Sequence, residues 1–303
     1  MRDTKTSFNL TIIVPVKNME GRLGRLMDWL LEADNLNIET IVICNGCTDK
    51  TYDVLFDFKI KSNLSNAVVL NSEVVGPGRA RNLGISIAKG RYLVFWDADD
   101  YGLVKVLSEL IRDETYKFDV MVCKYKQVIG DRQIVIKDWE DSKLGNLYEL
   151  GLNPGVWRII FNRKILQNCE FGSSMMGEDQ VFLTQVLAKN PVVIFSDEIL
   201  YEYHTGFKTQ LTANRTNLSG IPESLSQILR VLDTCTDEPA LVVSVMFLRQ
   251  IMTLLFRGTI KLKLKAVFLL LLFIFHGEKD RNLARKVLKR VKLFIVVIGK
   301  VVK

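Results

Sequence analysis

Tyr92-Leu93-Val94-Phe95-Trp96-Asp97-Ala98-Asp99-Asp100 changes within one residue from an apolar run to three carboxylates. The apolar part has the length and composition of a buried central strand, and Gly90 and Gly102 bound the stretch. Ligands of open α/β sheets bind beyond the carboxyl ends of the strands. Acids at this point can hold a hard divalent cation, which usually brings phosphate with it. The alternative is a solvated acidic turn, in which Asp is common.

Along the chain before this stretch, short apolar runs alternate with helical patterns. In the first helical pattern, Leu23, Leu26 and Leu30 recur at helical spacing. This alternation predicts the α/β class, with a mostly parallel, Rossmann-like sheet and flanking helices. The expected strands are residues 10–15, 40–44, 67–70 and 92–96, and the expected helices between them begin near residues 21, 49 and 78.

The basic residues are concentrated at the C-terminal end. The whole chain has 303 residues and a net charge of +7. Residues 257–303 carry 13 Lys or Arg against 2 Asp or Glu, a net of +11, so the rest of the chain has a net charge of −4. A body without a net positive charge argues against a nucleic-acid binder, and the basic end favours local contact with an anionic surface.

Apolar helical patterns fill the same end of the chain. Residues 241–256 are strongly apolar, residues 266–275 are an uninterrupted apolar run, and residues 281–303 interleave Lys and Arg with apolar side chains. A run of ten is too short to span a bilayer, which takes about 20 residues. We therefore expect a catalytic domain at residues 1–220 and a helical, membrane-associating region at residues 221–303. The alternative is a helical bundle that packs on the main domain or on another subunit of a homo-oligomer.

Cysteine usage indicates the compartment. The five cysteines are odd in number and scattered, and the N-terminus lacks the apolar core of a signal peptide. We expect a reduced, cytoplasmic protein, peripheral on the inner face of the cell membrane.

Four polar segments follow the expected strands or open the next helix: residues 15–18, 45–49, 78–82 and 97–100. The carboxyl ends of parallel strands share one edge of a sheet, so these segments are expected to form one crevice. A nucleoside diphosphate suits their inventory, with polar groups for base and ribose, a divalent ion on the acids, and Arg79 or Arg81 for the phosphates.

Six motifs occur in a familiar order between residues 9 and 205. They are Thr11-Ile12-Ile13-Val14-Pro15 followed by Asn18, Asn45-Gly46-x-Thr48-Asp49, Gly78-x-Ala80-Arg81-Asn82-x-Gly84-Ile85, Ala88-x-Gly90-x-Tyr92, Asp97-x-Asp99-Asp100, and Glu178-Asp179 after a glycine. Together they resemble the family 2 glycosyltransferases of the GT-A fold, of the bacterial surface-polysaccharide type.

The resemblance implies a role for each matching residue. Asp99 would reach a Mn²⁺ or Mg²⁺ ion, Asp97 the ribose, and Asp179 would act as the general base. The family more often has an acid where Asn45 stands, yet an amide can still hydrogen-bond a uracil edge. The implied nucleotide-sugar-binding residues are Pro15, Asn18, Asn45, Arg81, Asp97, Asp100 and Glu178; His204 is a second candidate metal ligand, and Trp157 and Arg158 are acceptor residues.

We therefore expect an inverting, metal-dependent glycosyltransferase, a hexosyl- or N-acetylhexosaminyl-transferase. It would move a sugar from a nucleotide-sugar, with UDP favoured, to a glycan or polyprenyl-linked glycan in cell-surface polysaccharide synthesis. Two alternatives stay open. A nucleotidyltransferase would be favoured by a Gly-rich basic loop after the first strand, which residues 17–21 do not supply convincingly. A non-catalytic membrane scaffold has no physical need for Arg81, Asp99 and Asp179 together.

Overall fold

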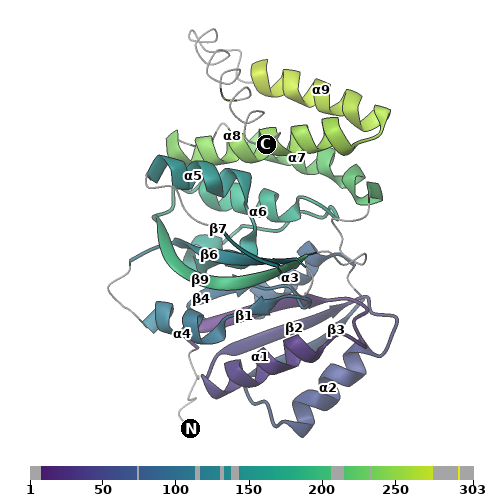
Figure 1. Ribbon diagram of the computed structural model, residues 1–303, viewed down its shortest axis with the longest axis vertical. Helices are drawn as coiled ribbons and strands as arrows, with labels where there is room; N and C mark the ends of the chain where they lie inside the picture. Colours follow the sequence, from purple (N-terminus) through teal and green to yellow (C-terminus); the bar gives the residue numbers. More distant parts are fainter. Residues whose placement is uncertain are drawn as a thin grey trace. The chain divides into compact units, whose positions relative to one another are not determined.

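The computed structural model describes residues 8–73, 75–112, 117–129, 133–137, 143–205, 215–232, 234–235, 237–275 and 293. They form two compact units (Figure 1). Unit 1 comprises Met1–Trp139, Gly155–Phe171 and Pro191–Phe207, and unit 2 comprises Glu140–Pro154, Gly172–Asn190 and Lys208–Lys303. The boundary at residue 220 stays a prediction. The basic segment 281–303, expected to associate with a membrane, lies outside the described residues except for Leu293.

One mixed sheet organises unit 1. Its strand order is β3-β2-β1-β4-β8-β6-β9-β5, with β7 paired to β6. The first four of these strands are joined by parallel pairs, which confirms the sheet expected from the alternating pattern. β8 runs antiparallel to both β4 and β6, so the rest of the sheet is mixed. The strands are β1 (Leu10–Val16), β2 (Glu39–Asn45), β3 (Ala67–Ser72), β4 (Tyr92–Phe95), β5 (Tyr101–Gly102), β6 (Val120–Ile129), β7 (Gln133–Lys137), β8 (Ile159–Asn162) and β9 (Val193–Thr205).

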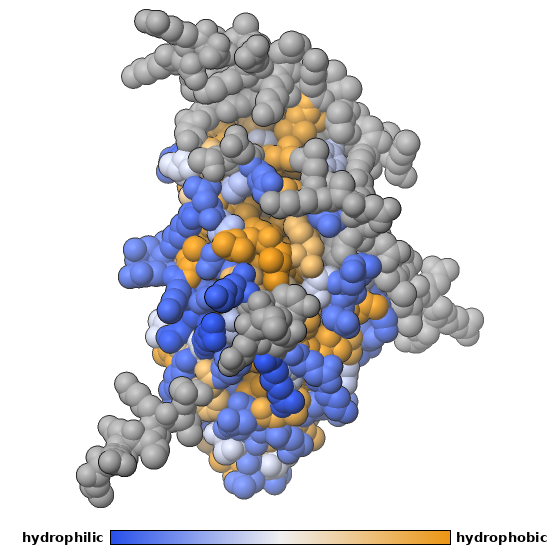
Figure 2. All heavy atoms as spheres, turned by 90° about the vertical axis from the view of Figure 1, so that its left-hand side faces the viewer, coloured by the Kyte–Doolittle hydropathy of each residue, from blue (hydrophilic) through white to orange (hydrophobic). Residues whose placement is uncertain are grey.

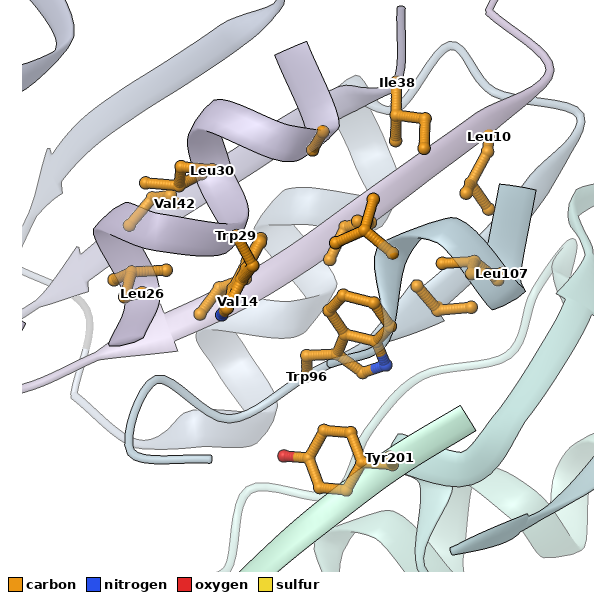
Figure 3. Close-up of a cluster of buried hydrophobic side chains, with 14 of the residues drawn as sticks. Leu10, Val14, Leu26, Trp29, Leu30, Ile38, Val42, Trp96, Leu107 and Tyr201 are labelled. Carbon is orange, nitrogen blue, oxygen red and sulfur yellow. The ribbon is translucent and has the colours of Figure 1, made fainter. Parts of the chain in front are cut away.

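Helices cover both faces of the parallel strands, because successive side chains of a strand point to opposite faces. Val14 of β1 packs in one buried cluster with Leu26 and Trp29 of α1 (Figure 3). Its neighbour Ile13 contacts α3 instead, where a Cβ atom on Gly84 would lie 2.4 Å from Ile13 Cγ2. Only glycine allows this close approach of helix and strand. The helices of unit 1 are α1 (Gly24–Asn35), α2 (Thr51–Lys61), α3 (Pro77–Ile87) and α4 (Val104–Arg112), with the 3₁₀ turns η1 (Val156–Arg158) and η2 (Arg163–Leu166).

Aromatic packing holds the end of β4 against β9. The ring of Trp96 meets the ring of Trp29 edge to face, with centroids 5.3 Å apart. On the other side, the Trp96 ring lies 6.1 Å from the ring of Tyr201 in β9 (Figure 3). All three side chains are fully buried. This packing fixes the backbone at the end of β4, where the acidic turn begins.

Unit 2 is helical and is built around α8. This helix contacts α5, α6, α7 and α9, and it buries apolar side chains from Val242 to Leu254. Gly258 lies so close to the Leu254 carbonyl that a Cβ atom would be 2.4 Å from its oxygen, which permits the turn into α9. The helices are α5 (Lys143–Leu152), α6 (Glu178–Leu187), α7 (Ile221–Leu232), α8 (Asp237–Arg257) and α9 (Ile260–Phe275), with η4 (Arg215–Gly220) before α7.

Among the described residues, one helix is long and apolar enough to cross a membrane. It is the segment Glu238–Arg257, with a mean hydropathy of 1.8, and 56% of its most apolar window is buried within the protein. A helix that buries most of its apolar side chains against four neighbouring helices has the properties of a bundle core. For α8, then, the bundle interpretation of the C-terminal region is the better supported one.

The surface is uneven in character. On the face drawn in Figure 2, hydrophilic residues make up most of the surface in the lower part of the picture. Hydrophobic residues gather higher up and also reach the surface near the top.

Candidate functional site

The loops after β1 and β2 are tied together by side-chain hydrogen bonds. Asn18 adopts a left-handed backbone with φ of 50°. Its Oδ1 accepts from the Thr48 backbone N–H at 2.8 Å, and its Nδ2 donates to Thr48 Oγ1 at 3.1 Å. The next residue, Met19, donates its N–H to Thr51 Oγ1 at 2.7 Å. Asn18 thus links the two loops at the edge of the sheet where Pro15, the last residue but one of β1, pairs with Ile43 of β2.

Asn45 ends β2 with a buried acceptor. The residue is 3% exposed, and no hydrogen-bond donor within the described part of the chain reaches its Oδ1 atom. A buried amide oxygen without a partner loses its hydration and gains nothing in return, which is unusual in a folded protein. The oxygen is therefore suited to accept a hydrogen bond from a ligand.

Arg81 and Asp97 form an ion pair between α3 and the end of β4. Arg81 Nη2 lies 2.7 Å from Asp97 Oδ1, and the arginine side chain is nearly fully buried. The guanidinium also lies over the ring of Phe171, 5.3 Å from its centroid. The pair brings a phosphate-binding type of side chain to the acids that follow Trp96.

Asp100 is the most deeply buried acid of the group, at 2% exposed. Its Oδ2 accepts from the Tyr201 hydroxyl at 2.8 Å, and its Oδ1 accepts from the His204 backbone N–H at 2.7 Å. Burial, with the charges of Asp97 and Asp99, raises the pKa of Asp100 to about 8. Burial raises the pKa of Tyr201 well above its usual value, as does the charge of Asp100, so its hydroxyl stays protonated as a donor.

Asp99 is half-buried between its acidic neighbours and two arginines. Burial and the charge of Asp97 raise the pKa of Asp99, while Arg22 and Arg25 partly offset this effect. Arg25 Nη1 also donates to the Asp99 carbonyl oxygen at 3.0 Å. Two acids with raised pKa values side by side are suited to a cation, which would relieve their mutual repulsion.

His204 lies next to the acids through its backbone. Burial and the charge of Arg25 lower the pKa of His204, which favours the neutral imidazole that metals bind. The side chain also approaches Glu202, with Nε2 3.9 Å from Oε2. Within the described residues, no group of three or more His, Cys, Asp or Glu side chains is arranged to hold a metal by itself. The role of His204 as a ligand stays a prediction.

Trp157 stands in a stack of aromatic rings. It stacks on Tyr201 at 4.8 Å and on Tyr203 at 5.2 Å, and meets Tyr125 edge to face at 4.6 Å. Its neighbour Arg158 is 1% exposed, with its guanidinium over the Tyr125 ring. Trp157 is only half-buried and adjoins the tyrosine that holds Asp100. The acceptor roles of Trp157 and Arg158 stay predictions.

Glu178 and Asp179 belong to unit 2, where they are the first two residues of α6. Gly177 precedes them with φ of 83°, a left-handed conformation that favours glycine. Ser224 of α7 holds this turn by donating to the Met176 carbonyl at 3.0 Å. Negative side chains in a first helical turn are stabilised by the helix dipole.

The structure brings most of the expected residues of unit 1 together and adds some that the sequence did not indicate. Asp97 and Asp100 share Tyr201, whose hydroxyl accepts from the Asp97 N–H at 3.1 Å. Tyr201 and Arg25 were missed, because neither stands in a motif and Tyr201 is 101 residues from Asp100. A tyrosine in a strand normally signals core packing only.

The chain is also similar in sequence to known proteins. Residues 11–176 match the model of the family described as glycosyl transferase family 2. The chain is 26% identical over 214 residues to glycosyltransferase GlyA of Streptococcus pneumoniae, covering 64% of this chain and 30% of that protein. It is 36% identical over 126 residues to a poly(ribitol-phosphate) beta-glucosyltransferase of Bacillus spizizenii, covering 40% and 20%. The chain thus spans less than two thirds of the length of these curated relatives.

Solved structures share the fold. The chain superposes on S. aureus TarS residues 1–349 in complex with UDP-GlcNAc with a TM-score of 0.71 at 18% identity, covering 96% of this chain and 90% of that one. A mannosyltransferase of Pyrobaculum calidifontis in complex with GDP-Man and Mn²⁺ gives a TM-score of 0.55 at 13% identity, covering 96% and 86%. These likenesses confirm the GT-A type of fold expected from the motifs.

Proposed function

Since this chain belongs to glycosyl transferase family 2, we propose that it transfers a sugar from a nucleoside-diphosphate sugar to a glycan acceptor. One observation carries the proposal: Asp97, Asp99 and Asp100 follow β4 as a partly buried acidic group, paired with Arg81 and braced by Tyr201. Repelling acids held in place at a sheet edge are unfavourable for the free protein. They are useful when a donor diphosphate arrives with its cation.

UDP is the proposed nucleotide. Asn45 would accept the imino N–H of uracil with the Oδ1 atom that lacks a partner among the described residues. Support comes from TarS, a structural neighbour that is known in complex with UDP-GlcNAc and with UDP. The donor sugar is proposed to be a hexose or an N-acetylhexosamine.

The residues present fit a divalent ion. Mg²⁺ and related ions are commonly held by one or two carboxylates together with substrate phosphates, rather than by a complete protein cage. Asp99 is the proposed ligand, with His204 as a second candidate, because Asp99 is half-buried beside Asp97 and a cation would offset the repulsion between the two carboxylates. When bound, Mn²⁺ or Mg²⁺ would neutralise charge on the departing diphosphate.

The chain's own residues would do the rest of the chemistry. Asp179 is proposed to take the proton of the acceptor hydroxyl. The oxygen of that hydroxyl bonds to the anomeric carbon of the donor sugar, while the bond from this carbon to the diphosphate breaks. Attack from the opposite side inverts the anomeric centre. An ionised Asp179 suits this role, and the start of α6 stabilises such a charge. Glu178 and Pro15 are proposed to contact the donor, and Trp157 and Arg158 the acceptor.

The acceptor is proposed to be a cell-surface glycan or its polyprenyl-linked precursor. Two relatives are transferases that act on poly(ribitol-phosphate), which makes a bacterial surface polymer a reasonable class. A lipid-linked acceptor would lie at the cytoplasmic face of the cell membrane. We therefore propose that the protein is peripheral on that face.

The direct test is a thermal-shift screen of the full chain against UDP-, GDP-, CMP- and dTDP-sugars, with and without Mn²⁺. A UDP-sugar should raise the melting temperature most, and Mn²⁺ should increase the shift. Asp179→Asn should keep this shift yet lose transfer by a factor of about 10² to 10⁴, since it removes only proton transfer. Full transfer activity in Asp179→Asn would exclude Asp179 as the base. The control is Asp57→Asn, because Asp57 of α2 has an exposed carboxylate.

A further inference from the structure

The helix α9 packs on unit 2 through one face only. Ala266, Leu269 and Phe273 are at most 5% exposed, and their spacing of three and four residues sets them on one side of the helix. Phe273 stacks on Phe247 of α8, with ring centroids 4.9 Å apart. Thr259 caps the start of the helix by accepting the Leu262 N–H. One side of α9 is therefore anchored to the bundle (Figure 1).

The opposite side of α9 is apolar and exposed. Its residues follow the spacing i, i+4, i+7, i+8, i+11 and i+12, which is one continuous stripe on a helix. An exposed contiguous apolar patch marks a surface that binds something. The α9 stripe consists of Ile260, Leu264, Val267, Phe268, Leu271 and Leu272, exposed by 80%, 68%, 46%, 61%, 49% and 41%.

Lysines flank the α9 stripe on both sides. At 100° per residue, Lys261 and Lys265 lie along one edge of the stripe, and Lys263 lies along the other. All three are exposed, and α9 contains no acidic residue. Lysines in this position can lay their methylene stems along apolar surface and extend their ammonium groups outward.

This arrangement distinguishes between occupants of the stripe. A second copy of the chain, packed on the same surface by two-fold symmetry, would bring two sets of lysines toward each other with no acids on α9 to pair them. On an anionic membrane, by contrast, the lipid headgroups pair with the lysines and the apolar stripe contacts the acyl chains. Charge complementarity therefore favours lipid.

We propose that the α9 stripe, flanked by Lys261, Lys263 and Lys265, docks on an anionic lipid surface, with α9 lying in the plane of the interface. The helix has 16 residues. Over these described residues the helix is about 24 Å long, shorter than the roughly 30 Å hydrocarbon core, and lysines flank its stripe on both sides, which suits a helix in the interface plane. This inference rests on the peripheral membrane association proposed above and names the surface responsible.

Vesicle flotation of the full chain tests the docking surface. Vesicles would contain phosphatidylcholine alone or mixed with phosphatidylglycerol. Wild-type protein should float with the anionic vesicles and much less with the neutral ones. The double variant Leu264→Glu with Phe268→Glu should lose at least tenfold in partitioning, and the triple lysine-to-glutamine variant at positions 261, 263 and 265 should lose the preference for anionic lipid.

Ile60→Glu is the matched control, because Ile60 of α2 is as exposed as Phe268, at 61%. It should float like the wild type. Equal flotation of the wild type and the Leu264→Glu, Phe268→Glu variant would overturn the proposal, as would a wild type that binds no vesicles. A wild-type dimer in light scattering that the double variant converts to monomer would assign the stripe to a second copy instead.

Nucleotide binding separates this test from the proposed activity. The double variant should keep its thermal shift with UDP-sugar and Mn²⁺, which also shows that it is folded. A chain that floats through the stripe yet binds no nucleotide-sugar would refute the enzymatic proposal alone. A chain that binds nucleotide-sugar and ignores vesicles would refute only the docking surface.

Discussion

The Tyr201 hydroxyl donates a hydrogen bond of 2.8 Å to Asp100, 101 residues earlier in the chain. The same oxygen accepts the Asp97 N–H, so one buried side chain of β9 braces both ends of the acidic turn. Trp157 stacks on the tyrosine ring. Tyr201 thereby links the aromatic group around Trp157 to the acids that we propose to hold the donor.

Tyr201→Phe keeps the ring and its stacking but removes the brace. A buried acceptor and a buried donor lose their partner, so we expect the free energy of unfolding to fall by about 1–3 kcal/mol. We also expect weaker UDP-sugar binding, because the acids lose their fixed geometry. Urea unfolding and nucleotide titration measure the two effects. Tyr52→Phe on α2 is the control, and a Tyr201→Phe protein that binds nucleotide-sugar like the wild type would show that the brace is merely structural.

Asp99→Asn should affect function and stability in opposite directions. The raised pKa of Asp99 means that its charge is unfavourable in the metal-free fold. Removing the charge should leave the melting temperature unchanged or higher, while the Mn²⁺-dependent part of the UDP-sugar thermal shift disappears. Thermal unfolding with and without Mn²⁺ measures both. An Asp99→Asn protein that retains the Mn²⁺ effect would require another metal ligand.

Asp100 should make the stability of the metal-free protein depend on pH. Its pKa rises from 3.8 to about 8 on folding, so between these values the folded state holds a proton that the unfolded state has released. Stability should therefore be highest at the acid end of this window and fall as the pH rises through it. Denaturation midpoints from pH 4 to pH 8 measure the trend. Asp100→Asn should flatten the profile, and an unchanged slope would assign the effect to other groups.

Asn45→Ala should weaken nucleotide binding with little effect on folding. Its Oδ1 has no partner to lose within the described residues. The free energy of unfolding should thus change by less than about 1 kcal/mol, while the loss of one hydrogen bond to the base weakens UDP binding about tenfold. Calorimetric titration with UDP and with GDP measures it. A variant that binds UDP as tightly as the wild type would remove Asn45 from base recognition.

The strands and the acidic turn were predictable because their signals are local. A buried parallel strand needs a continuous apolar run, and Leu10–Val16, Glu39–Asn45 and Tyr92–Phe95 follow such runs closely. The proximity of Arg81 and Asp97 agrees with the single crevice expected at this sheet edge, whereas the ion pair between them was not predicted. The antiparallel β8 between β4 and β6 was not predictable, because strand pairing depends on contacts distant in sequence.

The C-terminal region shows the same limit. By hydropathy alone, residues 241–256 and 266–275 are two similar apolar segments. In the structure α8 buries most of its apolar side chains against four helices, whereas α9 exposes six apolar side chains. Composition does not say which face of a helix meets a neighbour, since that depends on how the helices pack.

The family, the parallel strands and the acids that follow β4 were predictable from the residues, because each depends on residue type and spacing along a short stretch. Three features are visible in the folded chain alone: Tyr201 braces Asp97 and Asp100, Asn45 buries an acceptor without a partner among the described residues, and α9 exposes its stripe. Hydrogen bonding and burial are properties of neighbours in space, and the chain brings those neighbours together only when it folds.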